Sequence, residues 1–316
     1  MAKIALLFPG QGIQHKGMGE EVYDAFTPAK EIYHKAIDIL KLRRRIVFSK
    51  RFFYHFMAER TDHVQPAVFV ANHALYESFR KRAPRLEFFV TAGYSLGEYN
   101  AIVAAGAISF ESALTLVQKR GQIMHTHSVD IEGGLVALLS DNQETLRSTV
   151  SDLARNEVYP ALFSTPLNTT VGGLKRHLKE HLVAPEMKKK GIRVLPVKVE
   201  GPFHTEYMKH AGDSLNEVIS SIQLQDPDRR IMSNASAKYI IDPRDIQEAL
   251  YLQMFNPVRW SESVARMWQS GVDTFIIIGP DQREIMKGML KQIAPNSTVM
   301  TVKDPASLEE AVKLVS

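Results

Sequence analysis

The sequence predicts an α/β fold in which a large domain with a parallel sheet is interrupted by a smaller domain. Short apolar runs of strand type alternate with helical patterns before residue 128 and again after residue 200, as in a parallel sheet covered by helices. Between about 130 and 199 the order of elements is instead β-α-β-β-α-β, the split βαβ arrangement. We therefore expect a large domain made of residues 1–128 and 200–316 and an inserted small domain of residues 129–199.

Strands are expected where short apolar or β-branched runs are bounded by glycine, proline or polar residues. In chain order they are Lys3–Phe8, Phe88–Ala92, Leu135–Leu139, Tyr159–Phe163, Asn168–Val171, Arg193–Val199, Arg230–Asn234, Thr274–Ile278 and Thr298–Val302. Helices are expected where apolar residues recur every three or four positions. These are residues 20–42, Ala67–Arg82, Leu96–Ala105, Leu114–Arg120, Glu144–Glu157, Leu174–Lys190, Thr205–Ile222, Ile246–Met254, Ser261–Ser270, Arg283–Gln292 and Leu308–Val315.

Three segments between the first two predicted helices are less regular. Lys41–Arg45 is basic, which favours a solvated helix end, with an anion- or carrier-docking patch as the alternative. Phe52–Met57 is aromatic and is expected to pack on the core. Thr61–Pro66 is expected to be a turn, with Pro66 in the first turn of the next helix, where a missing N–H costs nothing.

The composition excludes several classes of protein. The 316 residues are 45% hydrophobic and 23% charged, which is typical of a globular protein. The absence of cysteine excludes disulfides, thiolate metal sites and cysteine nucleophiles. A net charge of +4 suits an anionic substrate or partner but is too small to indicate nucleic acid. The apolar run near the start is too short for a signal peptide or a membrane span, so we expect a cytoplasmic enzyme without a membrane anchor.

The stretch Phe88–Glu98 contains the pattern most indicative of chemistry. An apolar run is followed by Gly-Tyr-Ser-Leu-Gly at residues 93–97 and then by a helical pattern. Gly-x-Ser-x-Gly between a strand and a helix is the nucleophile elbow, whose glycines permit a sharp turn that lifts the serine hydroxyl above the sheet. We predict that Ser95 is a nucleophile and that the N–H of Leu96 faces the developing oxyanion; a surface serine in a glycine-bounded turn is the alternative.

A glycine-rich loop, Pro9–Gly12, follows the first predicted strand. Phosphate binding is one interpretation of such a loop, but neither the P-loop pattern nor a spaced G-x-G-x-x-G is present. We therefore interpret the loop as one that brings a backbone N–H and the side chain of Gln11 beside Ser95.

A serine hydroxyl needs a base within hydrogen-bond reach. Most of the 11 histidines, such as His34, His177 and His181, lie in charged helical patterns and are expected at the surface. His204 instead follows Gly-Pro-Phe just past a predicted strand, where α/β folds collect functional groups. We predict His204 as the base, with a structural loop histidine as the alternative. No aspartate between Ser95 and His204 has a context that marks it as the third member of a catalytic triad. A Ser-His dyad, in which a backbone carbonyl holds His204, is therefore an open alternative.

Arg120 is followed by Gly121 in an amphipathic pattern, and on the residues alone a solvated cation at a helix end is favoured. The alternative is a planar guanidinium that binds a substrate carboxylate through two parallel hydrogen bonds.

Six short motifs occur along the chain in a fixed order. They are Phe8–Gly12, Gln65–Ala67, Gly93–Tyr99, Arg120–Gly121, Gly201–His204, and Gln253 followed by Pro257–Trp260. In this order they resemble the malonyl-CoA:acyl carrier protein transacylase family over essentially the whole chain. The third motif is similar to the discrete acyltransferases that serve trans-acyltransferase polyketide synthases.

The resemblance implies a large α/β-hydrolase-like domain interrupted by a small ferredoxin-like domain, with the active site in the cleft between them. It implies Ser95 as nucleophile and His204 as base, oriented by the backbone carbonyl of Gln253. The remaining implied roles are oxyanion-hole N–H groups from Gln11 and Leu96, a neighbouring Gln65, and Arg120 as the clamp for the free carboxylate of a malonyl group.

The sequence departs from the family pattern at four places. Ile13 stands where serine is usual, Tyr94 where histidine is commoner, and Asp281 at the last position of the late Glu-Ile-Gly-Pro-Gly pattern. The segment Ser164–Gly173 retains little of the usual small-domain motif. None of these departures removes a predicted catalytic group, but the last affects residues expected to contact the acyl group and the carrier.

The resemblance implies that the enzyme moves a malonyl group from malonyl-CoA through a Ser95 ester to the phosphopantetheine thiol of an acyl carrier protein, in polyketide or fatty-acid biosynthesis. Phe203 resembles the malonyl-selecting version of its motif, because a bulky ring crowds a 2-methyl branch. An acyl hydrolase that proofreads carrier proteins is the alternative, and it needs no Arg120; a catalytically silent docking module is a third. We expect a monomer without cofactor or metal that binds neither nucleic acid nor membrane.

Overall fold

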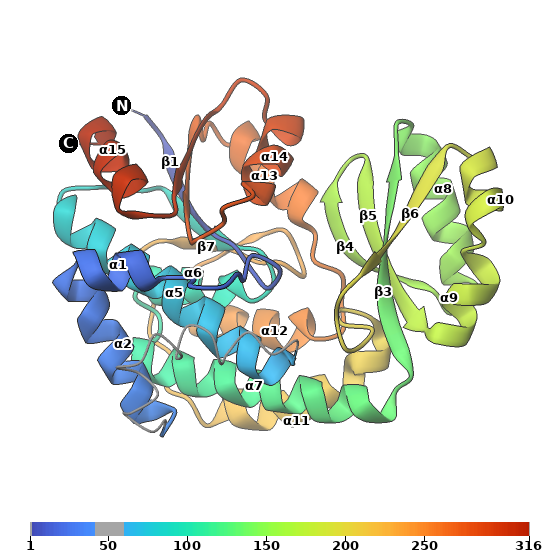
Figure 1. Ribbon diagram of the computed structural model, residues 1–316, viewed down its shortest axis with the longest axis horizontal. Helices are drawn as coiled ribbons and strands as arrows, with labels where there is room; N and C mark the ends of the chain where they lie inside the picture. The colour runs from blue at the N-terminus through green and yellow to red at the C-terminus, as the bar shows by residue number, and fades with distance from the viewer. Residues whose placement is uncertain (1, 42–59, 316) are drawn as a thin grey trace.

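The computed structural model describes residues 2–41 and 60–315, and its strands form two sheets (Figure 1). The six-stranded sheet has the order β10-β9-β1-β2-β7-β8, and the four-stranded sheet has the order β4-β5-β3-β6. The basic segment Lys41–Arg45, except for Lys41, and the predicted core contact of Phe52–Met57 lie outside the described residues.

The strands of the large sheet are β1 (Ile4–Phe8), β2 (Val90–Gly93), β7 (Arg230–Met232), β8 (Tyr239–Ile240), β9 (Thr274–Ile278) and β10 (Thr298–Val302). Those of the small sheet are β3 (Gly133–Ser140), β4 (Tyr159–Thr165), β5 (Asn168–Leu174) and β6 (Ile192–Val197). The helices are α1 (Glu20–Ala25), α2 (Thr27–Ile39), α5 (Thr61–Arg82), α6 (Gly97–Ala104), α7 (Phe110–Asp130), α8 (Gln143–Ala154), α9 (Lys175–His181), α10 (Ala184–Lys189), α11 (Lys209–Ser220), α12 (Pro243–Gln253), α13 (Trp260–Gln269), α14 (Ile285–Ile293) and α15 (Pro305–Val315), with a 3₁₀ turn at Glu206–Met208.

Five strands of the large sheet are parallel, which confirms the predicted fold class. Strand β1 pairs with β2 on one side and β9 on the other, and β10 and β7 extend the sheet in the same direction. The unpredicted two-residue strand β8 runs antiparallel to β7. Because Phe8 pairs with Gly93, the loop after β1 and the predicted nucleophile elbow leave the sheet at the same edge.

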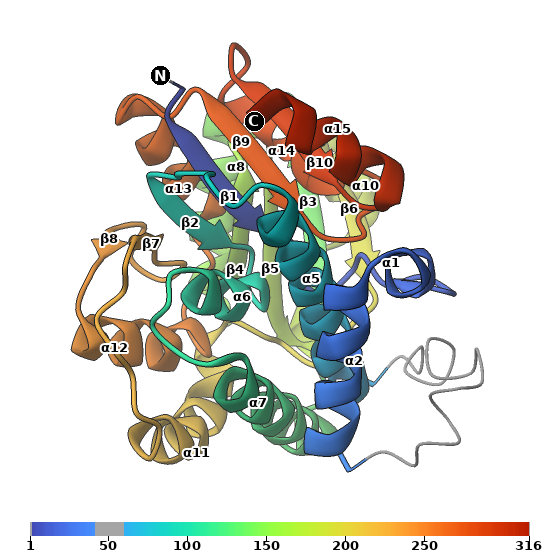
Figure 2. The ribbon, with the colours of Figure 1, turned by 90° about the vertical axis from the view of Figure 1, so that its left-hand side faces the viewer.

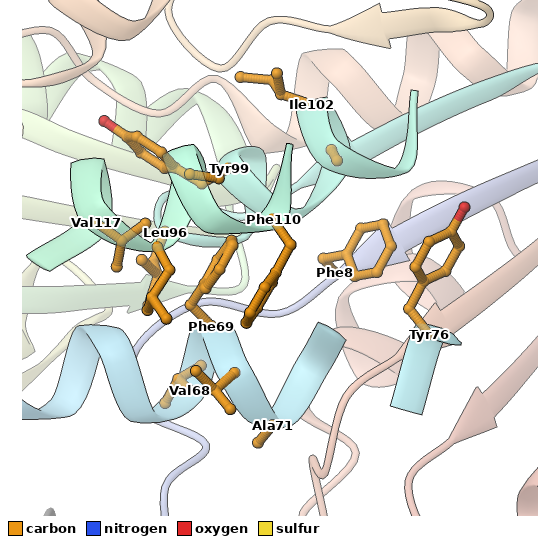
Figure 3. Packing of buried hydrophobic residues seen from close by; sticks show 14 of the residues in the cluster. Phe8, Val68, Phe69, Ala71, Tyr76, Leu96, Tyr99, Ile102, Phe110 and Val117 are labelled. Carbon is orange, nitrogen blue, oxygen red and sulfur yellow. The ribbon is translucent and has the colours of Figure 1, made fainter. Parts of the chain in front are cut away.

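Alternation along β1 places its side chains in two separate cores. Leu6 and Phe8 pack with α5, α6 and α7, which lie on one face of the sheet, whereas Ala5 and Leu7 pack with α13 and α14 on the other. In Figure 2, α6 and α7 lie below β1 and β2. Figure 3 shows the first core, where the rings of Phe69 and Phe110 stack with centroids 5.7 Å apart. Strand β2, from which the elbow starts, is buried at all four of its residues.

The small sheet is antiparallel throughout and has the order of a split βαβ unit, as predicted. The single helix expected over Leu174–Lys190 is wrong, because α9 ends at His181 and α10 begins at Ala184 with Pro185 in its first turn. Proline fits a first turn, where its missing N–H has no intrahelical partner. The domain boundaries at 128/129 and 199/200 stay a prediction.

The helix expected over residues 20–42 is also two helices. Phe26 is extended, with φ −127° and ψ 126°, and separates α1 from α2. The apolar periodicity continues across this break. The signal that marks it is Pro28, which lies in the first turn of α2.

Two expected helix boundaries are wrong. Helix α5 begins at Thr61, so Pro66 lies inside it rather than in its first turn. Helix α7 continues through Gly121 to Asp130, so Arg120 is not at a helix end. A Cβ on Gly121 would lie 2.8 Å from Cα of Asp62, so this glycine permits the close approach of α7 to α5.

The two sheets are joined next to the elbow. The segment before α13 pairs with β4, with the N–H of Phe163 donating to the carbonyl of Val258 and the N–H of Val258 donating to the carbonyl of Ala161, both at 2.9 Å. Within the described residues, no helix combines the length and the apolar character needed to span a bilayer.

Candidate active site

The elbow at Ser95 has the strained geometry that its motif predicts. Ser95 has φ +51°, in the left-handed region, and its N–H donates to Oδ1 of Asn234 at 2.7 Å. A Cβ on Gly93 would lie 1.8 Å from the carbonyl carbon of Gly97, and one on Gly97 would lie 2.1 Å from the carbonyl oxygen of Phe8. Both glycines are therefore required by the tight turn and by its contact with β1.

His204 lies against Ser95, 109 positions away in the chain. Its Nε2 is 2.7 Å from Oγ of Ser95, and its Nδ1 is 2.7 Å from the backbone carbonyl of Gln253. Because a carbonyl can only accept, Nδ1 carries the proton and Nε2 is left to accept from the serine hydroxyl. Burial, and then the charge of Arg120, lowers the pKa of His204 to about 3, so the imidazole is neutral at pH 7.

Arg120 is buried, 1% exposed, and faces the same point. Its Nη2 lies 3.5 Å from Oγ of Ser95 and donates to Oε1 of Gln253 at 2.9 Å, while Nη1 donates to Oε1 of Gln65 at 2.5 Å. The ring of Tyr99 lies 5.4 Å from the guanidinium carbon. Because Arg120 is buried and lies inside α7, the solvated helix-end interpretation is wrong; a buried cation whose hydrogen-bond partners are neutral lies beside the serine.

The expected oxyanion groups lie in adjacent segments. A Cβ on Gly10 would lie 3.5 Å from the backbone nitrogen of Leu96, so the loop after β1 touches the elbow. The side chain of Gln11 accepts a hydrogen bond from the hydroxyl of Thr61 at 2.9 Å. The roles of the Gln11 and Leu96 N–H groups stay a prediction.

Sequence reasoning missed two buried residues that support the elbow. Glu98 is fully buried and accepts from the N–H of Asn234 at 2.9 Å and from Nε2 of Gln253 at 2.5 Å. Burial raises the pKa of Glu98 to about 7, against the lowering effect of these hydrogen bonds and of Arg120. Glu98 lies within the elbow motif, and Asn234 follows a strand end, but neither pattern identifies a partner.

Phe203, expected to select the acyl group, and Tyr94, a departure from the family pattern, have different surroundings. Phe203 is 4% exposed and belongs to the main core, so its role in acyl selection stays a prediction. The hydroxyl of Tyr94 is 2.7 Å from Oγ of Ser164, and its ring packs edge-on against Trp260 at 5.4 Å. Two departures from the family pattern, Tyr94 and the segment that begins at Ser164, therefore meet in one hydrogen bond.

A parallel sheet that carries a serine at a strand–turn–helix junction, with a neutral histidine on its hydroxyl, defines an enzyme of the serine acyl-transferring class. The chain belongs to the acyl transferase domain family, whose sequence model matches residues 5–283.

Similar proteins cover nearly the whole chain. A malonyl CoA-acyl carrier protein transacylase of Bacillus subtilis is 35% identical over 99% of this chain and 97% of its own. A polyketide biosynthesis malonyl CoA-acyl carrier protein transacylase of the same organism is 29% identical over 94% and 99%. Among solved structures, an acyl-carrier-protein S-malonyltransferase of Burkholderia pseudomallei is 33% identical with a TM-score of 0.89, covering 98% of this chain and 99% of that one. A malonyl-transacylase in complex with its type II polyketide acyl-carrier protein has a TM-score of 0.90 at 29% identity, covering 99% and 100%.

Proposed function

We propose that this acyltransferase moves a malonyl group from malonyl-CoA to the phosphopantetheine thiol of an acyl carrier protein, in fatty-acid or polyketide biosynthesis. The observation that carries the proposal is the buried guanidinium of Arg120, 3.5 Å from Oγ of Ser95. A cation at this distance suits an acyl group that has an ionised carboxylate in addition to its thioester carbonyl. The names of two relatives, a malonyl CoA-acyl carrier protein transacylase and a polyketide biosynthesis malonyl CoA-acyl carrier protein transacylase, support the same substrate and carrier.

In the first half of the reaction, Oγ of Ser95 attacks the thioester carbonyl while its proton passes to Nε2 of His204. The N–H groups of Gln11 and Leu96 stabilise the oxyanion of the tetrahedral intermediate. Collapse of the intermediate breaks the carbon–sulfur bond, and the CoA sulfur leaves with the proton that His204 held. The product is a malonyl ester of Ser95.

In the second half, His204 takes the proton of the carrier thiol, whose sulfur attacks the ester. Collapse releases the serine oxygen, which regains a proton from His204. A carboxylate bound to Arg120 opposes the positive charge that lowers the pKa of His204, so the bound malonyl group makes this histidine a stronger base.

Intact-mass measurement tests the proposal. The unmutated protein, mixed briefly with malonyl-CoA, should gain one malonyl group, gain acetyl from acetyl-CoA far more slowly, and pass the malonyl group to added carrier protein. Ser95→Ala should gain neither. Equal loading of the two acyl groups, or loss of the malonyl group to water faster than to the carrier, would count against transfer and in favour of hydrolysis. The monomeric state and the cytoplasmic location stay predictions.

A further inference from the structure

The hydroxyl of Thr61 joins two parts of the site that the sequence did not connect. Its Oγ1 donates to Oε1 of Gln11 at 2.9 Å and accepts from Nε2 of Gln65 at 2.8 Å. Oε1 of Gln65 in turn accepts from Nη1 of Arg120 at 2.5 Å. Thr61 is the first residue of α5 and is 0% exposed. A single buried hydroxyl therefore links the loop after β1 to the guanidinium.

The direction of each hydrogen bond follows from Arg120, which can only donate. Gln65 must turn its oxygen toward the guanidinium and its NH₂ group toward Thr61. The hydroxyl of Thr61 accepts that hydrogen bond and donates its own proton to Gln11. All donors thus point from Arg120 toward Gln11, and hydrogen bonds aligned in this way strengthen one another.

The position of Thr61 is itself set by neighbouring segments. Its N–H donates at 2.7 Å to Oε2 of Glu200, whose other oxygen lies 3.0 Å from Nδ1 of His125 on α7. Glu200 belongs to the segment that leads into His204. A Cβ on Gly121 would lie 3.3 Å from the carbonyl of Thr61, so α7 packs closely against this turn. Thr61 is therefore held in place by Glu200 and α7, which are both outside the loop after β1.

We propose that Thr61 is a positioning residue, whose hydroxyl sets the separation between the Gln11 loop and the Arg120 guanidinium. The inference rests on the proposed function, in which the first group faces the thioester oxygen and the second binds the carboxylate. A malonyl thioester has a thioester carbonyl and a carboxylate separated by one methylene. It therefore needs the Gln11 loop and the Arg120 guanidinium at a fixed distance from each other. An acetyl thioester has only the thioester carbonyl, so its reaction does not depend on that distance.

A purely structural threonine makes a different prediction from a positioning one. Thr61→Val keeps the shape and loses the hydroxyl, whereas Thr61→Ser keeps the hydroxyl and loses the methyl group. If the residue only fills space, valine is tolerated and serine is the poorer replacement. If the hydroxyl positions the two neighbours, serine restores what valine loses.

The experiment compares rates of acyl-enzyme formation from malonyl-CoA and acetyl-CoA, by rapid quench and intact mass, for the full-length unmutated protein and both variants. Removing the buried hydroxyl takes away the donor to Oε1 of Gln11 and leaves Nε2 of Gln65 with only the weak acceptor Sδ of Met124, at 3.3 Å, so Thr61→Val should lower the malonyl rate constant about 10-fold or more. The acetyl rate constant should fall at least about threefold less than the malonyl one, because acetyl does not use Arg120. Thr61→Ser should stay within about threefold of the unmutated protein for both substrates. Thermal midpoints establish that each variant is folded, and Thr61→Ala replaces valine if that variant does not fold.

Three results overturn the inference: an unchanged malonyl rate in the valine variant, an equal fall for both substrates, or a serine variant as impaired as valine. The proposed function fails separately, if the unmutated protein shows no preference for malonyl over acetyl. A protein that prefers malonyl but tolerates Thr61→Val would refute only the role of Thr61.

Discussion

Replacing Arg120 with alanine removes the buried cation beside Ser95 and tests the substrate assignment directly. Under the proposed function, the malonyl carboxylate leaves water for charge-assisted hydrogen bonds to this guanidinium, whereas acetyl places a methyl group there. Removing one partner of a buried charge pair costs roughly 2–5 kcal/mol. Since each 1.4 kcal/mol is about tenfold, kcat/KM for malonyl-CoA should fall about 30- to 4,000-fold.

The same substitution removes the donor to Oε1 of Gln65 and to Oε1 of Gln253, and it also changes the pKa of two neighbouring groups. The positive charge of Arg120 lowers the pKa of His204, so its loss makes the histidine a stronger base. Loss of the cation also raises the pKa of Glu98 further above its ordinary value, and Glu98 then takes up a proton rather than staying as an unbalanced buried charge. Use of uncharged acyl groups should therefore rise relative to malonyl.

The assay measures single-turnover formation of the malonyl- and acetyl-enzymes, with the thermal midpoint as the control for folding. Arg120→Lys is the matched variant, because it keeps the charge but not the planar fork, and it should fall between the unmutated protein and the alanine variant. The reasoning is refuted if Arg120→Ala loads malonyl as fast as the unmutated protein, or loses malonyl and acetyl loading by the same factor.

Three further predictions concern stability. Burial lowers the pKa of His73 to about 4, and the unfolded state therefore binds more protons between pH 6.5 and 4. The free energy of unfolding should fall by roughly 3 kcal/mol over this range from His73 alone, and urea titrations of His73→Phe should show a smaller fall than the unmutated protein. Gly97→Ala places a methyl group 2.1 Å from the carbonyl of Phe8 and should cost roughly 2–4 kcal/mol in urea unfolding, with loss of acyl-enzyme; a normal midpoint would contradict the close contact. A double-mutant cycle of Tyr94→Phe and Ser164→Ala should give a coupling of roughly 0.5–1.5 kcal/mol, whereas additive effects would show that their hydrogen bond does not stabilise the protein.

Local patterns were sufficient for the elements that lie closest to the chemistry. Gly-x-Ser-x-Gly predicts a turn that only glycines allow, and the structure has that turn at Ser95 with φ +51°. The order of strands and helices predicted both sheets. The helix breaks at Phe26 and before Ala184 were missed because apolar periodicity continued across them, although Pro28 and Pro185 marked the new starts.

The sequence by itself determined which residue types are present for acyl transfer: a serine in an elbow, a histidine after a strand, and an arginine of undecided role. Only the tertiary structure decided that Arg120 is buried and that Thr61, Glu98 and Asn234 support the site. The reason is physical. Side chains more than 100 positions apart meet because strands pair in one register and α7 packs closely on α5 at Gly121, and neither the register nor the packing is a property of any local stretch.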